Sequence, residues 1–290
     1  MSKTRLSTLA SVLAWARDLF QNSQALLDHS SHGLDAEILL SFCIRKPRTY
    51  LRCWPDREVS ADSKKQFEQL ALRRAQGEPI AYLTARREFW DMTLQVTPAT
   101  LIPRQDTEVL VEAALELIPQ GQAWHIADLG TGSGAIALVL AKHRPRSHLV
   151  AVDNSREALA LAEANAKQQA ITNISFLCSH WFDQLPLATF DLIASNPPYI
   201  AVDDPHLQRG DVRFEPKQAL VSGKTGLDDL QHLIRHAADY LNPSGYLMLE
   251  HGYDQADAVR ALFEQSNWIN IVTFQDLSGH DRCTTAQRAR

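Results

Sequence analysis

The sequence contains little that would support a metal centre, a disulfide framework or a membrane anchor. Its four cysteines are scattered over 290 residues, without a Cys-x-x-Cys pair or a histidine at metal-ligand spacing. This pattern predicts free thiols in a reducing compartment and no metal. No apolar run approaches the length of a membrane span, and the N-terminal segment lacks the form of a signal peptide. We therefore expect a cytoplasmic protein without a membrane partner.

An excess of basic residues is also missing from the larger part of the chain. Residues 1–100 hold 14 Lys and Arg against 11 Asp and Glu, whereas the remaining 190 residues hold 15 against 23. Enzymes that bind polynucleotides normally carry a basic stripe near the active site. The net charge of −8 after residue 100 therefore disfavours direct nucleic-acid binding.

What the sequence does contain is a glycine-rich turn between a buried strand and an apolar helix, over residues 125–142. The turn consists of Gly130, Thr131, Gly132, Ser133 and Gly134. Alternate glycines let the backbone approach a ligand closely, and the helix start presents free N–H groups. Nineteen residues later an apolar run ends in Asp153, which suits hydrogen bonds to both hydroxyls of a ribose. The arrangement predicts an adenosine-containing cofactor without specifying which one.

A second motif, Asn196-Pro197-Pro198-Tyr199, follows the apolar run 190–195. Proline has no N–H and a fixed φ, so the carbonyls of this segment face few competing donors. Asn196 adds a side-chain oxygen as acceptor, and Tyr199 adds a flat face for stacking. We call these four residues the clamp, because they suit a planar group that carries an NH2, such as an amide or a base amine. They also suit an ordinary turn after a strand, so the motif alone leaves both interpretations open.

Together the two motifs favour methyl transfer to a nitrogen atom. Ligands of open α/β sheets bind at the carboxyl edge, to which the strand 190–195 delivers the clamp. A nicotinamide enzyme would need a hydride-acceptor site there, such as a carbonyl-binding His or a Tyr/Lys pair. This chain instead offers acceptors for an N–H. The sequence therefore predicts an N-methyltransferase that uses S-adenosyl-L-methionine.

The pattern of elements divides the chain near residue 100. Helical patterns cover 6–20, 34–43 and 61–76, with shorter helices between them, and predict a small helical bundle over 1–78. We expect this bundle to recognise a partner, with a purely stabilising appendage as the alternative. Residues 82–96 alternate, which predicts a β-hairpin linker over 79–100.

Strand and helix patterns alternate over 101–290. Two closing strands, at 269–276 and 282–287, are joined so tightly that they must be antiparallel. The charged segment 201–222 is long enough to be a lid or a partner-binding loop. We expect an α/β fold of the class I, Rossmann-like methyltransferase type, with a seven-stranded, mostly parallel sheet that contains one antiparallel strand.

Several stretches carry the pattern of a known family. They are 75–83, 87–90, 101–108, the glycine turn, 195–200, 214–216, 249–252, Asp276, Leu277, Gly279 and Arg282. On these residues the chain resembles the HemK/PrmC family, the N5-glutamine methyltransferases of peptide chain release factors. The clamp is shared with adenine and guanine N-methyltransferases, whereas 77–82 and 101–104 point to the glutamine enzymes. The chain departs from the family at Gln105, where proline is usual, and at His180, where an acid is frequent.

The resemblance implies that the methyl group goes to the side-chain amide of the glutamine in a Gly-Gly-Gln motif. The Asn196 side-chain oxygen and the Pro197 carbonyl would hold the two amide protons, while Tyr199 packs against the amide plane. Pro198 belongs to the same substrate site, and Phe89 is a weaker candidate for its wall. The resemblance implies a release factor as partner, and we expect the enzyme to be a monomer.

The cofactor residues follow from the same resemblance. The glycine turn and Asp153 would hold S-adenosyl-L-methionine, with Trp181 along the adenine and Asn196 near the cofactor. Two other substrates remain open, namely an exocyclic amine of adenine or guanine in nucleic acid and a glutamine of a ribosomal protein. A third alternative is a binding module on an inactive methyltransferase fold, against which the intact turn, Asp153 and clamp all argue.

Overall fold

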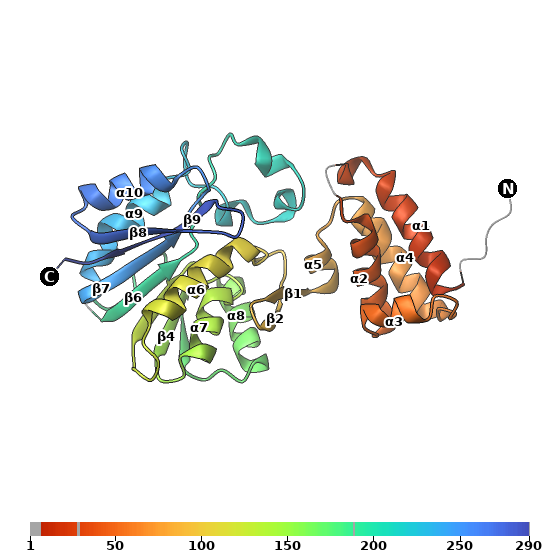
Figure 1. Ribbon diagram of the computed structural model, residues 1–290, viewed down its shortest axis with the longest axis horizontal. Helices are drawn as coiled ribbons and strands as arrows, with labels where there is room; N and C mark the ends of the chain where they lie inside the picture. Colours follow the sequence, from red (N-terminus) through yellow and green to blue (C-terminus); the bar gives the residue numbers. More distant parts are fainter. Residues whose placement is uncertain (1–6, 28–29, 188, 290) are drawn as a thin grey trace. The chain divides into compact units, whose positions relative to one another are not determined.

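The structure, a computed structural model, describes residues 7–27, 30–187 and 189–289, which divide into two compact units (Figure 1). The helical unit comprises the chain up to Ala85 together with Pro205–Phe214. The sheet unit comprises Arg86–Asp204 and the chain from Glu215 onward. Within the described residues, no helix is long and apolar enough to cross a membrane.

The helical unit is a bundle around one apolar core. Its helices are α1 (Leu9–Gln21), α2 (His32–Ile44), α3 (Arg48–Cys53), α4 (Ala61–Ala75) and α5 (Ile80–Thr84), with a 3-10 turn at Gln24–Leu26. Leu6, where the sequence predicted the first helix to begin, lies outside the described residues. Thr8 and Ser60 cap α1 and α4 through their hydroxyls. The core is fully buried at Phe20, Leu39 and Phe67.

Residues 205–214 belong to the helical unit, although the sequence predicted 101–290 as one continuous domain. The Arg74 side chain is 2% exposed, with Nε donating to Asp35 Oδ2 at 2.8 Å and Nη1 to Asp211 Oδ1 at 3.0 Å. Arg213 adds bonds to the carbonyls of Ala25 and Gln76. A buried guanidinium needs such partners, so these contacts fix the segment to α4.

The hairpin is part of the sheet unit and is shorter than predicted. Its strands are β1 (Arg86–Phe89) and β2 (Met92–Gln95), whereas Tyr82–Thr84 form part of α5, whose N-cap is Pro79. Asn165 of α8 (Arg156–Gln168) accepts from Gln95 N at 2.7 Å and donates to Gln95 O and Ser133 O. The hairpin is thereby joined to the glycine turn.

The central sheet has the predicted number and directions of strands. Its strands are β3 (His125–Leu129), β4 (His148–Asp153), β5 (Ile174–Cys178), β6 (Phe190–Ser195), β7 (Leu241–Glu250), β8 (Ile269–Gln275) and β9 (Asp281–Gln287). They lie in the order β5-β4-β3-β6-β7-β9-β8, and β9 runs antiparallel to both of its neighbours. This confirms a mostly parallel sheet of seven strands with one antiparallel strand.

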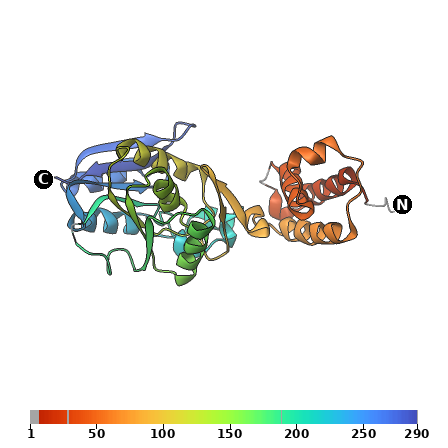
Figure 2. The same cartoon turned by 90° about the horizontal axis from the view of Figure 1, so that it is seen from below.

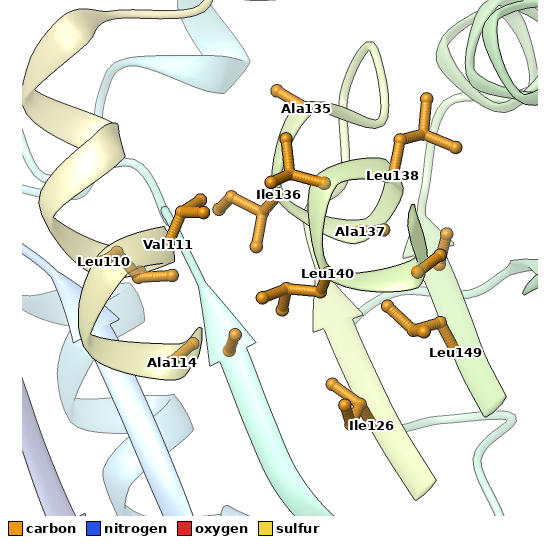
Figure 3. Packing of buried hydrophobic residues seen from close by; sticks show 14 of the residues in the cluster. Leu110, Val111, Ala114, Ile126, Ala135, Ile136, Ala137, Leu138, Leu140 and Leu149 are labelled. Atoms are coloured by element: carbon orange, nitrogen blue, oxygen red, sulfur yellow. The ribbon is translucent and has the colours of Figure 1, made fainter. Parts of the chain in front are cut away.

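Helices cover both faces of the sheet (Figures 1 and 2). On one face lie α6 (Glu108–Leu117), α7 (Ala135–His143) and α8, and on the other lie α9 (Asp228–His236) and α10 (Ala256–Gln265). Successive strand residues point to opposite faces, so Ile126 packs with α6 and α7 while Ala127 packs with α9 and α10. Figure 3 shows Leu110, Ile136 and Leu140 filling the first of these two cores.

Candidate active site

A cleft at the carboxyl edge of the sheet brings the two predicted motifs together. Leu129 of β3 pairs with Val152 of β4 on one side and with Ser195 of β6 on the other. The residues that follow these strands therefore meet at one edge. Of the residues predicted from the sequence, the cleft is lined by Gly130, Thr131, Gly132, Ser133, Asp153, Trp181, Asn196 and Pro198.

The glycine turn follows a path that depends on its lack of side chains. Gly132 has φ +56°, and the nearest atom to a Cβ added there would be 4.0 Å away, so this position opens to the cleft. Gly130 has φ +73° and lies beside the Trp181 ring, which an added Cβ would approach to 3.4 Å. The turn thus exposes main chain to the cleft, as a closely bound ligand requires.

Gly134 has a different role from the two glycines before it. It is the N-cap of α7 with φ +86°, and it does not line the cleft. A Cβ there would lie 3.0 Å from Leu138 Cδ1 and 3.3 Å from Ala162 Cβ. Gly134 is therefore required for the packing of α7 against α8.

Asp153 supports the glycine turn while lining the cleft. Its Oδ2 accepts from Gly132 N and its Oδ1 from Ser155 N, each at 2.9 Å. Burial raises the pKa of this carboxyl group, and the backbone N–H groups act against the rise. The carboxylate thus fixes the main chain around the cleft.

Asp128 is a buried residue of this region that the sequence did not single out. Its Oδ2 accepts from Thr131 Oγ1 at 2.6 Å and from Ala137 N at 3.2 Å. Its Oδ1 is buried with no hydrogen-bond partner in the part of the chain that the structure describes. Burial raises the pKa of Asp128 to about 7. Its place at the end of a buried strand, three residues before Thr131, is the signal that could have found it.

The clamp is oriented by Thr107, a second residue not identified from the sequence. Thr107 is 3% exposed and its Oγ1 accepts from Asn196 Nδ2 at 3.1 Å. Because Nδ2 is engaged in this way, the amide flip of Asn196 is set and Oδ1 is left as its acceptor. Thr107 and Asn196 both line the cleft.

The Tyr199 ring does not reach the cleft wall. Its Oη donates to Glu250 Oε1 at 3.2 Å, and burial is the main cause that raises the pKa of Tyr199 well above its usual range. Its carbonyl accepts from Gln255 Nε2 at 3.0 Å. Pro197 is also buried and outside the cleft lining. The structure therefore brings Asn196 and Pro198 to the cleft surface and puts Tyr199 behind them.

Phe89, predicted as a wall residue, lies in the core. It is 1% exposed, packs in the cluster between the sheet and α6 and α7, and does not line the cleft. It is the last residue of β1, where the alternation turns its side chain inward. The departure at His180 does lie at the cleft, beside Trp181.

An ion pair holds a second part of the cleft wall. Arg104 Nη2 lies 2.7 Å from both carboxylate oxygens of Glu215, whose side chain is fully buried. Glu215 precedes Pro216, which lines the cleft together with Gln218 and Ala219. The stretch 101–104 is itself held where Arg87 Nε donates to the Pro103 carbonyl at 3.0 Å. Three stretches that carry the family resemblance, 87–90, 101–108 and 214–216, are thus bonded to one another beside the cleft.

Comparison with known proteins agrees with this arrangement. Residues 105–209 match the methyltransferase small domain, and residues 11–84 match the PrmC N-terminal domain. A release factor glutamine methyltransferase of Salmonella typhimurium is 50% identical over 89% of this chain and 93% of its own length. One from Aliivibrio fischeri is 47% identical over 91% of this chain and 93% of its own length.

Among solved structures, a 16S rRNA N2 G1207 methyltransferase of T. thermophilus, in complex with AdoMet and guanosine, is similar in fold. Its TM-score is 0.51 at 20% identity, over 71% of this chain and 50% of that chain. This likeness shows the methyltransferase fold alone. The sequence relatives, which match nearly end to end, show more: the chain belongs to the family of release factor glutamine methyltransferases.

Proposed function

We propose that this protein transfers the methyl group of S-adenosyl-L-methionine to the side-chain amide nitrogen of the glutamine in the Gly-Gly-Gln motif of peptide chain release factors. The observation that carries the proposal is the orientation of Asn196 at the cleft. One N–H of its Nδ2 donates to Thr107, which orients the amide and leaves Oδ1 as an acceptor for an N–H. An amide NH2 fits that acceptor, whereas a carboxylate does not.

The residues around the cleft suit this cofactor. Gly130 and Gly132 expose main chain, Gly132 has open space in front of it, and Asp153 offers a carboxylate for the ribose hydroxyls. Trp181 supplies an aromatic surface for the adenine. When bound, the cofactor supplies an electrophilic methyl group on its sulfonium sulfur.

The clamp would act on the amide by fixing its two protons. Asn196 Oδ1, which lies at the cleft, would accept one proton. The Pro197 carbonyl, the second acceptor that the resemblance implies, belongs to a residue outside the cleft lining, so Asn196 would carry the larger part of this role. The Tyr199 ring would support the main chain of both residues. An amide nitrogen is a poor nucleophile because its lone pair is delocalised into the carbonyl. Acceptors that fix the N–H groups favour the rotated, more pyramidal nitrogen, and this interaction is strongest in the transition state.

No strong general base is needed for this role. As the N–C bond forms, the S–C bond of the cofactor would break and S-adenosyl-L-homocysteine would leave. The nitrogen becomes acidic only as the methyl group arrives, so carbonyl oxygens are sufficient hydrogen-bond acceptors during the transfer, and the proton would then pass to water. What the site must supply is orientation, which the bond from Asn196 to Thr107 and the burial of Pro197 both support.

We also propose that the partner is bound as a protein and not through nucleic acid, by a monomeric enzyme in the cytoplasm. The acidic balance after residue 100 supports the first part. The four cysteines are free thiols, in keeping with a reducing compartment.

The test is transfer of labelled methyl from S-adenosyl-L-methionine to a purified bacterial release factor and to the same factor with the Gly-Gly-Gln glutamine replaced. We expect label on the native factor and none on the variant. Equal label on both would contradict the proposed target. Label on ribosomal protein or RNA, with none on either factor, would move the function to one of the other substrates.

A further inference from the structure

One carboxyl group beside the clamp has no role in the function described so far. Glu250 is the last residue of β7 and is 1% exposed. Its Oε2 is buried without a hydrogen-bond partner among the residues that the structure describes. Glu250 does not line the cleft, so it does not meet a ligand there directly. A buried carboxyl group is costly to maintain, which calls for a reason.

Glu250 connects the two ends of the clamp. Its Oε1 accepts from Tyr199 Oη at 3.2 Å, and the Thr107 hydroxyl interacts with the same carboxyl group. Thr107 in turn accepts from Asn196 Nδ2 at 3.1 Å. The Glu250 side chain thus contacts Tyr199 directly and is linked to Asn196 through Thr107.

The titratable and charged groups around Glu250 come from several neighbouring segments of the sheet unit. Asp106 of the 3-10 turn Gln105–Thr107 faces it, and Arg282 of β9 lies on the same side, bound to Asp106 at 3.1 Å and to Asp276 at 2.8 Å. Cys283, which pairs with Glu250 across the sheet, and His251, its chain neighbour, complete the titratable surroundings together with Tyr199. Arg282 is shared with two other carboxylates and does not neutralise Glu250 by a direct ion pair within the described residues.

We propose that Glu250 is a positioning residue for methyl transfer, which holds Tyr199 and, through Thr107, Asn196 in the orientation that receives the substrate amide. The proposal rests on the proposed function, because it assigns Glu250 to the same clamp. It also explains why the stretch 249–252, which carries no cleft-lining residue, stands out in the sequence.

Ionisation of Glu250 gives the proposal a measurable consequence. An ionised carboxylate accepts a stronger hydrogen bond from a hydroxyl than a neutral acid does. Burial, and to a lesser degree Asp106, raises the pKa of Glu250 to about 7, while the hydroxyls of Thr107 and Tyr199 and the charge of Arg282 act against the rise. The clamp is therefore held more firmly above neutral pH than below it, and kcat should rise across this range.

The kinetic experiment compares Glu250→Leu, Glu250→Gln, Tyr199→Phe and the double variant Glu250→Leu/Tyr199→Phe on the release factor. Glu250→Leu removes the acceptor and should lower kcat on the order of tenfold to a hundredfold, the loss expected for one charged hydrogen bond. KM for the factor and the cofactor affinity should stay within about twofold. Glu250→Gln keeps an acceptor oxygen, so its kcat should fall less than that of Glu250→Leu. Because the amide does not ionise, its kcat should no longer rise with pH.

The double variant tests whether Glu250 acts through Tyr199. If it does, adding Tyr199→Phe to Glu250→Leu should cost less than Tyr199→Phe costs alone. The matched control is Asp191→Asn, a carboxylate at the other end of a neighbouring strand, which accepts from His125 N and Asn242 Nδ2. Its kcat and pH profile should equal those of the native enzyme.

A spectroscopic measurement needs no substrate and keeps the inference separate from the proposed function. With tyrosine labelled with 13C at Cζ, the Tyr199 signal is the one missing in Tyr199→Phe. Its chemical shift should titrate near pH 7 in the native chain and in Asp191→Asn, and should be flat in Glu250→Gln. A flat signal in the native chain, native kcat in Glu250→Leu or fully additive effects in the double variant would each overturn the inference. Failure of methyl transfer in the native enzyme, with the titration present, would instead remove the proposed function.

Discussion

The two sides of the cleft are built by different means. On the cofactor side the main chain of the glycine turn forms part of the cleft surface: Gly130 N and Thr131 N donate to the Val152 carbonyl, and Asp153, 21 residues from Gly132, accepts from Gly132 N and Ser155 N. On the clamp side the orientation of Asn196 and Tyr199 depends on side chains that lie 89 and 51 residues away in the sequence. A site built from backbone depends on local chain geometry, whereas a site held by side-chain hydrogen bonds can be changed by one substitution without altering the fold.

The largest expected effect comes from removing the acceptor of the clamp. We expect Asn196→Ala to lower kcat on the order of a hundredfold or more, as for other pre-organised hydrogen-bonding groups. The dissociation constant of the cofactor should stay within about threefold, because the glycine turn and Asp153 are untouched. Single-turnover methyl transfer and calorimetric titration with the cofactor measure the two quantities. Retained transfer would contradict the role of the clamp.

Each side of the cleft contains one buried carboxyl group, so both sides respond to pH. Asp128 and Glu250 both have a pKa of about 7 in the folded chain, above the ordinary values of 3.8 and 4.5. Between those values the unfolded chain releases a proton that the folded chain keeps, so each group lowers the stability as pH rises from about 4 to 7. Glu250→Gln removes this loss.

The free energy of unfolding of Glu250→Gln, minus that of the native enzyme, should therefore increase on the order of 3 kcal/mol from pH 5 to pH 8. Urea unfolding at the two pH values measures the change. Asp128→Asn should behave in the same direction and should additionally loosen Thr131. If the variant and the native enzyme differ in free energy of unfolding by the same amount at both pH values, Glu250 is already ionised at pH 5.

Asp153→Asn should weaken the cofactor side while leaving the clamp intact. The new amide nitrogen faces a backbone N–H of either Gly132 or Ser155, so one of the two bonds becomes a repulsion. We expect the cofactor dissociation constant to rise on the order of tenfold to a hundredfold. The KM for the release factor, measured at saturating cofactor, should be unchanged. A rise confined to that KM would assign Asp153 to the partner.

The smallest effects come from a matched pair of glycines. Gly134→Ala adds a methyl group 3.0 Å from Leu138 at positive φ and should cost about 1–3 kcal/mol of stability. Gly132→Ala meets open space, so it should cost about 1 kcal/mol and should reduce cofactor affinity more than Gly134→Ala does. Thermal unfolding and cofactor titration of both variants give the comparison. If Gly132→Ala loses more stability and Gly134→Ala loses more cofactor affinity, the two glycines do not have these separate roles.

The parts of the fold that could be predicted from the sequence are those encoded locally. The glycine turn, the strand that ends in Asp153 and the tight connection between the closing strands each follow from residue types within a short window, and the structure contains all three. The meeting of turn and clamp at one edge also follows, because parallel strands end on the same side of a sheet.

The rest depends on contacts that no local pattern reveals. Tyr82–Thr84 alternate as a strand would, but Pro79 begins a helical turn there. Phe89 is an aromatic near the site in sequence, yet the end of β1 turns it into the core. Residues 205–214 join the helical unit through Arg74, whose partner Asp211 is 137 residues away. Thr107 and Glu250 were missed for the same reason.

The position of the transferred methyl group tests the role of the clamp most directly. A release factor incubated with S-adenosyl-L-methionine and either the native enzyme or Asn196→Ala would be digested, and its Gly-Gly-Gln peptide fragmented by tandem mass spectrometry. We predict a methyl group on the side-chain amide nitrogen of the glutamine with the native enzyme, and little or none with Asn196→Ala. A methyl group on another residue, or equal methylation by both enzymes, would show that the clamp does not hold a glutamine amide.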